Sequence, residues 1–328
     1  MVRFGIIGTN WITESFINAA LDVEDFELVA VYSRTEDKAK QFADKFSVET
    51  IFTDMDRFLQ NDQMDAVYIA SPNVMHAGQA IEAMNAGKHV IVEKAIASNA
   101  TEVKELIDTA KRNGVLLMEA IKSIFLPNFQ AVKENLDKIG PVRRYFASYC
   151  QYSSRYDAYK EGNVMNAFKP EFSNGSLMDI GIYCIYPMVT LFGKPKKVHA
   201  NAYMLESGVD GQGSALFDYD ELNGSVMYSK VTNSYLPSEI QGEQGAIIID
   251  NINHPTKVEI KWNDGTVEDI SRPQKDNAMY YEAKAFIDAI KNNELESSIN
   301  TYENTLITAT ILEEARGQFG LVFPADNK

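Results

Sequence analysis

The chain is poor in cysteine, histidine and tryptophan, with two, four and two of them among 328 residues. The two cysteines, Cys150 and Cys184, are too few for the disulfide framework that holds many secreted proteins together, and their spacing is not that of a metal site. We therefore expect a reducing, cytoplasmic location and no bound metal.

Positive charge is also scarce. Lysine and arginine number 31 against 46 acidic residues, which gives a formal net charge of −15. No basic run offsets this charge, which opposes binding to DNA or to an anionic membrane. The first expected strand begins at residue 2, which leaves no room for a signal peptide, and no apolar run reaches membrane-spanning length. We expect neither a nucleic-acid partner nor a membrane.

Apolar residues make up 45% of the sequence. This content and the length of 328 residues predict a globular protein of two domains. Its first third alternates short buried strands with helices, a pattern that predicts right-handed crossovers and a doubly wound, parallel α/β sheet. We expect strands at 2–7, 26–32, 66–70, 89–92 and 115–119. We expect a helix that follows the turn at 8–13 and runs to about residue 21, and further helices at 35–46, 75–85 and 100–113. This domain is expected to cover residues 1–122.

The remainder, residues 123–328, has a different pattern. Strands follow one another without intervening helices, which predicts an α+β domain with a mostly antiparallel, open sheet. We expect strands at 142–152, 197–204, 214–219, 224–232, 238–241, 246–250, 257–262 and 266–270. We expect helices at 127–139, 175–192, 276–291 and 301–318.

The turn after the first strand is the first candidate site. A strand that breaks at glycine into a helix directs backbone N–H groups and the positive end of the helix dipole at one point, which suits a phosphate. Of the dinucleotide pattern G-x-G-x-x-G only the first glycine is present, with Asn10 and Thr13 at the other two positions. The stretch is either a degenerate dinucleotide site or an ordinary turn. Its candidate residues are Gly8, Thr9, Asn10, Trp11 and Ile12.

The end of the second strand bears on which dinucleotide would bind. An acidic residue there takes the ribose hydroxyls of NAD, whereas an arginine accommodates the 2′-phosphate of NADP. This chain has Ser33 and Arg34 at that place, with Lys38 one helical turn further on. The residues favour NADP over NAD, unless Arg34 and Lys38 are only solvated loop charges.

Two further segments end strands at the same edge of the predicted sheet. Ser71, Pro72 and Asn73 follow the strand 66–70, and His76 opens the next helix; this is a place for the nicotinamide half of a cofactor or simply the start of a helix. Glu93 and Lys94 end the strand 89–92. Lysine is rare at the end of a buried strand, so Lys94 is either a site residue or a lysine paired to Glu93.

Taken together, these segments resemble the Gfo/Idh/MocA oxidoreductases, and within them the branch of dihydrodiol and xylose dehydrogenases. The resemblance spans both predicted domains, because a further motif lies in the second. The segments that carry it are Gly8-x-Asn10, Ser33-Arg34, Ala70-Ser71-Pro72-Asn73-x-x-His76, Ala86-Gly87-Lys88-His89-Val90-x-Val92-Glu93-Lys94, Glu119-Ala120 and Gly175-x-x-x-Asp179-x-Gly181-x-Tyr183.

The resemblance implies hydride transfer between a nicotinamide cofactor and a carbinol carbon of a sugar, polyol or cyclic diol. It implies that Tyr183 exchanges the proton at the substrate oxygen and that Lys94 favours the ionised tyrosine. Asp179 lies four residues before Tyr183, so both face one side of a helix, where Asp179 can orient substrate hydroxyls or the proton donor. Alternatively, Tyr183 is a core aromatic and Asp179 a helix charge.

Three departures from the family pattern stand out. Ala95 follows Lys94 where relatives have proline, so we expect a trans peptide and a displaced lysine. Ile124 stands where close relatives carry arginine and Lys122 where an aromatic is common, so we expect a reshaped substrate pocket.

The alternative to an enzyme is a dinucleotide-binding regulator or sensor of sugar metabolism, against which the joint presence of Lys94, Asp179 and Tyr183 speaks. In either case we expect a small polyhydroxylated ligand. Relatives use the open face of the second-domain sheet to pair subunits, so we also expect a homo-oligomer, a dimer or higher.

Overall fold

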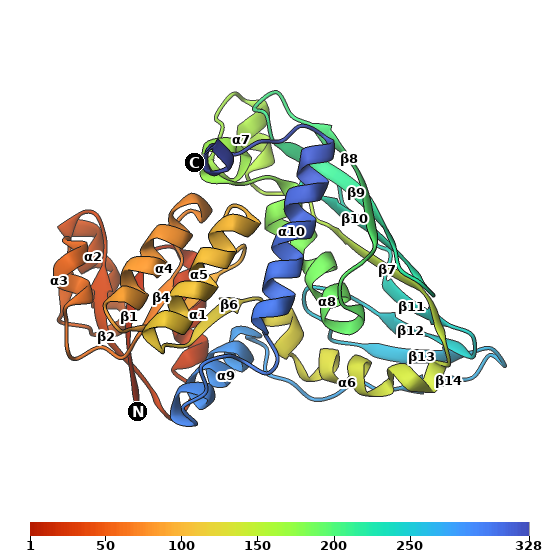
Figure 1. Ribbon diagram of the computed structural model, residues 1–328, viewed down its shortest axis with the longest axis horizontal. Coiled ribbons are helices and arrows are strands. Elements are labelled where there is room, and N and C mark those ends of the chain that lie inside the picture. The colour runs from red at the N-terminus through yellow and green to blue at the C-terminus, as the bar shows by residue number, and fades with distance from the viewer. Residues whose placement is uncertain (328) are drawn as a thin grey trace. The chain divides into compact units, whose positions relative to one another are not determined.

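The structure is a computed structural model that describes residues 1–327, and the chain forms two compact units (Figure 1). The first unit comprises Met1–Ile121 and Lys275–Tyr302; the second comprises Lys122–Gln274 and the chain from Glu303 onward. The chain therefore passes between the units three times, after Ile121, Gln274 and Tyr302. The sequence had suggested one passage, at residue 122.

The first unit contains a six-stranded sheet in the order β3-β2-β1-β4-β5-β6, and every strand pair in it is parallel. The order reverses between β1 and β4, the place where doubly wound sheets bind ligands. Its strands are β1 (Val2–Ile7), β2 (Phe26–Tyr32), β3 (Ile51–Phe52), β4 (Ala66–Ile69), β5 (His89–Glu93) and β6 (Leu117–Ala120). Its helices are α1 (Trp11–Ala20), α2 (Glu36–Ala43), α3 (Met55–Leu59), α4 (His76–Asn85), α5 (Ala100–Asn113) and α9 (Met279–Lys291).

Aromatic packing explains why α9 belongs to this unit although it lies far along the chain. Phe4 of β1 packs against Phe16 of α1, Phe26 of β2 and Phe286 of α9, with ring centroids 5.0–6.2 Å apart. Phe4, Phe16 and Phe286 are fully buried. Burial of such rings contributes about 2–3 kcal/mol each, so α9 stabilises the first unit.

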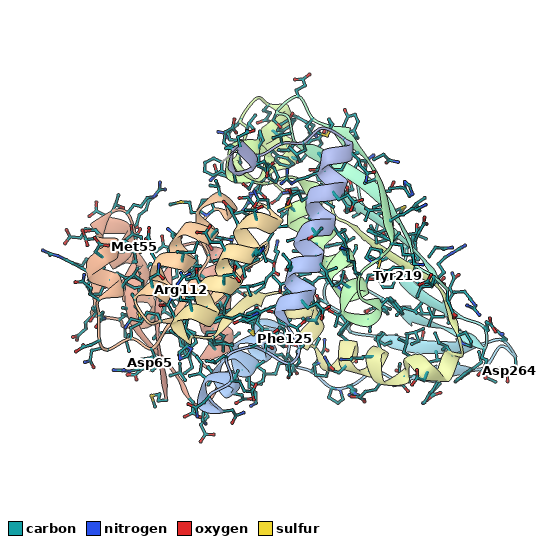
Figure 2. All side chains as sticks on the ribbon, in the orientation of Figure 1. Met55, Asp65, Arg112, Phe125, Tyr219 and Asp264 are labelled. Carbon is teal, nitrogen blue, oxygen red and sulfur yellow. The ribbon has the colours of Figure 1, made fainter. Side chains whose placement is uncertain are left out.

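The second unit contains an eight-stranded sheet in the order β14-β13-β12-β11-β7-β10-β9-β8. Neighbours are antiparallel except β7 and β10, which run parallel. The strands are β7 (Val142–Cys150), β8 (Lys197–Met204), β9 (Asp210–Asp218), β10 (Asn223–Ser229), β11 (Ser238–Gly242), β12 (Gly245–Ile249), β13 (Val258–Trp262) and β14 (Val267–Asp269). Figure 2 shows Asp264 at the tip of the β13–β14 hairpin.

Helices cover one face of this sheet. They are α6 (Pro127–Asn135), α8 (Ile182–Phe192) and α10 (Tyr302–Gln318), and the hydroxyls of Tyr186 on α8 and Thr305 on α10 lie 2.8 Å apart. Side chains on the opposite face alternate with the buried ones along each strand. Leu216 and Tyr203 are exposed there at 56% and 59%.

The expectation that no apolar run reaches membrane-spanning length is wrong. The helical stretch Pro170–Phe192 is long and apolar enough to cross a membrane by length and composition, with a mean hydropathy of 1.4 in its most apolar window. Of that window, 78% is buried inside the protein. Such burial is typical of the core helix of a globular domain, which passes the same test.

The remaining differences are local. The sequence analysis missed β3 and α3, which are only two and five residues long and carry too few residues for a periodic pattern. The predicted helix 35–46 ends as an α-helix at Ala43 and continues as a 3₁₀ turn to Phe46. The polar loop 153–169 contains a short helix, α7 (Tyr156–Lys160).

Candidate functional site

The turn between β1 and α1 is built around Gly8 and Asn10. Gly8 has a φ of +109°, and a Cβ on it would lie 2.7 Å from the carbonyl oxygen of Ala70, so only glycine fits. The Asn10 side chain caps α1 by accepting hydrogen bonds from the N–H groups of Ile12 and Thr13, at 3.0 and 3.2 Å. Its amide nitrogen donates to the Ala70 oxygen at 2.8 Å.

Asn10 therefore does more than tolerate the turn. It fastens the start of α1 to the end of β4 across the point where the strand order reverses. It also accepts from two of the N–H groups at the start of the helix, those of Ile12 and Thr13, so these two donors are already paired.

The residues that follow β2 offer positive charge to solvent. Ser33 is buried, whereas Arg34 and Lys38 are both exposed. Neither cation forms an ion pair with a residue that the structure describes. Exposed, unneutralised cations next to the β1–α1 turn fit the 2′-phosphate of NADP.

The segment after β4 is tied to the segment after β5 through His76. The imidazole Nε2 lies 2.8 Å from the Ser71 oxygen and Nδ1 lies 2.9 Å from the Ala95 oxygen. Burial lowers the pKa of His76, although its two carbonyl partners oppose that shift. A neutral ring donates to only one of the two carbonyls. His76 thus links Ser71 to the turn that carries Lys94, and its 1% exposure makes it a structural link.

The turn at Lys94 corrects one prediction. The Lys94–Ala95 peptide bond is cis, not trans as expected from the missing proline. The groups that follow it are held in place: the Ala95 oxygen by His76, and the Ile96 N–H by the Glu119 carboxyl at 3.0 Å. Tertiary contacts from α4 and β6 therefore fix this turn, and they are invisible in the local sequence.

Two buried acids accompany Lys94. Glu93 is 7% exposed and accepts a hydrogen bond from the Tyr68 hydroxyl at 2.7 Å. Glu119 on β6 is 2% exposed, and burial raises its pKa to about 8; the bond from Ile96 and the charge of Lys94 oppose that rise, and the charge of Glu93 adds to it. Burial therefore favours the protonated form of Glu119.

The second unit holds Asp179 and Tyr183. A π-helical turn, Leu177–Gly181, precedes α8 and carries Asp179, while Tyr183 lies in the first turn of α8. Gly175 begins this stretch with a φ of +148°, and a Cβ on it would strike the buried carboxyl of Asp210. That carboxyl accepts a bond from the Leu177 N–H at 2.6 Å, so it caps the helix.

Two residues that the sequence analysis missed lie beside Asp179 and Tyr183. The ring of Tyr149 on β7 meets that of Tyr183 edge-on, with centroids 5.8 Å apart. Burial and, secondarily, the charge of Asp179 raise the pKa of Tyr149 to about 12. Lys230, directly after β10, donates to the Asp179 carboxylate at 2.6 Å. No local motif marks either residue, because each reaches the cluster only through the fold.

The predicted residues therefore fall into two groups. In the first unit, Gly8 and Asn10 meet the end of β4, and the residues after β4 and β5 meet around His76. In the second unit, Asp179 and Tyr183 meet Tyr149. Ile124 is fully buried in a 3₁₀ turn, Lys122–Phe125.

A parallel sheet in this strand order, with a glycine turn after its first strand, defines the class of Rossmann-type dinucleotide-binding proteins. Residues 2–121 match the profile of an oxidoreductase family with an NAD-binding Rossmann fold, and residues 129–248 match that of the Gfo/Idh/MocA C-terminal domain. The chain belongs to the Gfo/Idh/MocA oxidoreductase family. The predictions of family, fold class and oxidoreductase are confirmed.

The chain is similar to scyllo-inositol 2-dehydrogenase (NADP(+)) of Bacillus subtilis, which is 57% identical over 326 residues, with 99% of each chain covered. Mouse trans-1,2-dihydrobenzene-1,2-diol dehydrogenase is 29% identical, with 100% of this chain and 99% of the relative covered. A crystal structure of the 3-ketoreductase KijD10 from Actinomadura kijaniata, in complex with TDP-benzene and NADP, is 25% identical with a TM-score of 0.83 and covers 97% and 98% of the two chains.

Proposed function

We propose that the protein is an NADP-dependent oxidoreductase that transfers a hydride between the nicotinamide and a carbinol carbon of a cyclic polyol, sugar or diol. The observation that carries this proposal is the 57% identity, over 99% of both chains, to a dehydrogenase named for NADP(+) and scyllo-inositol. Exposed Arg34 and Lys38 after β2 support NADP, because both cations lack an ion-pair partner among residues 1–327.

The cofactor fits the first unit. Gly8 provides the side-chain-free turn that a pyrophosphate needs, and Arg34 and Lys38 would hold the 2′-phosphate. The residues after β4 and at the end of β5 would line the site of the nicotinamide half or support the main chain that lines it. They are Ser71, Pro72, Asn73, His76 and Glu93. When bound, the nicotinamide accepts or donates the hydride.

The remaining chemistry belongs to three side chains. Tyr183 exchanges the proton at the substrate oxygen as the carbinol becomes a carbonyl or the reverse. The positive charge of Lys94 stabilises the negative charge that develops on the substrate oxygen. Asp179, with 32% of its side chain exposed, orients substrate hydroxyls.

The test is a steady-state assay with inositols, a trans-dihydrodiol and pentoses as substrates, which follows the formation of NADPH from NADP or of NADH from NAD. We expect turnover with NADP that falls about 100-fold or more in Lys94→Met and in Tyr183→Phe. Tyr219→Phe is the matched control, because that hydroxyl bonds the Gly193 oxygen at 3.0 Å in the same unit. Unchanged rates in the first two variants would reject the roles of Lys94 and Tyr183. Tight NADPH binding without turnover on any substrate would favour the regulator instead.

We further propose a cytoplasmic homodimer formed through the exposed face of the second-unit sheet. Both cysteines are free thiols, as a reducing compartment requires. The face has a shallow depression lined by Arg144, Phe146, Leu216, Asn223, Ser225 and Gln241, and apolar side chains on an open sheet face are suited to a second copy. Sedimentation at micromolar concentration should give a dimer or larger for the wild type and a monomer for Leu216→Asp. A monomeric wild type would refute the proposal.

A further inference from the structure

Lys230 is a lysine in an unusual place. It follows β10 directly, and its main chain is held on both sides: its N–H donates to the Gly211 oxygen at 2.9 Å, and its oxygen accepts from the Ser153 N–H at 2.8 Å. Its side chain is only 5% exposed. A buried ammonium is costly unless anionic and polar groups surround it.

The partners of that ammonium come from two segments. It donates to the Asp179 carboxylate at 2.6 Å and to the Ala167 oxygen at 3.3 Å. It also lies 4.9 Å from the centre of the Phe168 ring, within cation–π range. Lys230 therefore joins the helical turn that carries Asp179 to the polar loop 153–169.

The pair is asymmetric in its exposure. Lys230 is buried, whereas Asp179 keeps 32% of its side chain open to solvent. An ammonium donates and cannot accept, so contact with it favours the ionised carboxylate, which accepts hydrogen bonds but cannot donate them. The sequence had left two roles open for Asp179, orienting hydroxyls or orienting the proton donor.

We propose that Lys230 is a positioning residue of the substrate site: it holds Asp179 as an oriented carboxylate that accepts hydrogen bonds from substrate hydroxyls. This inference rests on the proposed function. It assigns part of the recognition of a polyhydroxylated substrate to a residue 51 positions away from Asp179. Lys230 itself does not touch the substrate.

The experiment is a double-mutant cycle on kinetics with a cyclic polyol and NADP. Lys230→Met should raise KM for the polyol about 10–100-fold, the loss typical of one charge-assisted hydrogen bond, with the Kd for NADPH unchanged. Lys230→Arg should restore most of the affinity. In the Asp179→Asn background, Lys230→Met should change KM by less than about threefold, because a residue that acts only through Asp179 has nothing left to position.

Lys88→Met is the matched control. Lys88 is also a buried lysine, 9% exposed, but it donates to the Asn61 and Met64 oxygens in the first unit. Its replacement should cost stability without changing KM. Should Lys230→Met not fold, Lys230→Gln takes its place in the cycle: it removes the positive charge but can still donate to Asp179, so KM should rise less than in Lys230→Met and again change little in the Asp179→Asn background.

Two outcomes separate the two proposals. A wild type that turns over no polyol with NADP overturns the proposed function and, with it, the role of Lys230. A wild type that is active, with losses that simply multiply in the double variant or with an unchanged KM in Lys230→Met, overturns the role of Lys230 alone.

Discussion

Glu119→Gln should make the first unit more stable, and more so as the pH rises. Burial raises the pKa of Glu119 to about 8 in the folded protein from its ordinary value of 4.5. Between these two values the folded state keeps a proton that the unfolded chain releases. The free energy of unfolding of the wild type therefore falls as the pH rises through this window.

The size of the effect follows from the two pKa values. At about 1.4 kcal/mol for each pH unit and proton, the wild type loses about 3 kcal/mol between about pH 5.5 and pH 8 that the variant does not lose. The glutamine oxygen can still accept the hydrogen bond from the Ile96 N–H, so the turn after Lys94 keeps its contact.

The assay is urea unfolding of wild type and variant at the two pH values, followed by circular dichroism. Asp210→Asn is the control: burial raises the pKa of Asp210 only to about 6, so its difference from the wild type should grow by only about 1 kcal/mol over the same range. A Glu119→Gln difference that stays constant with pH, or that shrinks, would show that Glu119 is ionised in the folded protein.

Three other variants test the geometry. Gly8→Ala puts a Cβ against the Ala70 oxygen at a φ of +109°. It should weaken NADPH binding at least about tenfold in a fluorescence titration, about 1.4 kcal/mol. An unaltered affinity would contradict the proposal that the turn at Gly8 binds the pyrophosphate. Arg34→Ala combined with Lys38→Ala should lower kcat/KM with NADP about 100-fold, the loss of two charge-assisted bonds, and leave NAD-dependent turnover unaffected. Gly175→Ala should lower the melting temperature by several degrees, about 2–3 kcal/mol of strain, and an unshifted calorimetric transition would refute the clash with Asp210.

The sequence was informative wherever a pattern is local. The doubly wound sheet follows from short apolar strands alternating with helices, and the strand bounds Phe26–Tyr32 and Lys197–Met204 agree with prediction. Asp179 and Tyr183 could be singled out because they lie four residues apart in one helical stretch. These features depend on neighbours along the chain, which a sequence displays directly.

What could not be predicted depends on neighbours in space. Tyr149 on β7 and Lys230 directly after β10 belong to no local motif, and only the fold brings them to the helical stretch that carries Asp179. The assignment of α9 to the first unit is of the same kind, because Phe286 packs against Phe4. The cis peptide after Lys94 sits in a turn whose contacts come from His76 and Glu119.

Two carboxyl groups, Glu119 in the first unit and Asp179 in the second, have different surroundings. This difference determines which form of each carboxyl group is favoured. Glu119 accepts a bond from a backbone N–H, and burial outweighs the opposing charge of Lys94 and raises its pKa to about 8. Asp179 has the ammonium of Lys230 at 2.6 Å, which favours the charged form despite partial burial. Residue type alone therefore does not assign a role to an acid in this protein. The balance between burial and a neighbouring cation does, which is why replacing Lys230 is the decisive test of what Asp179 does.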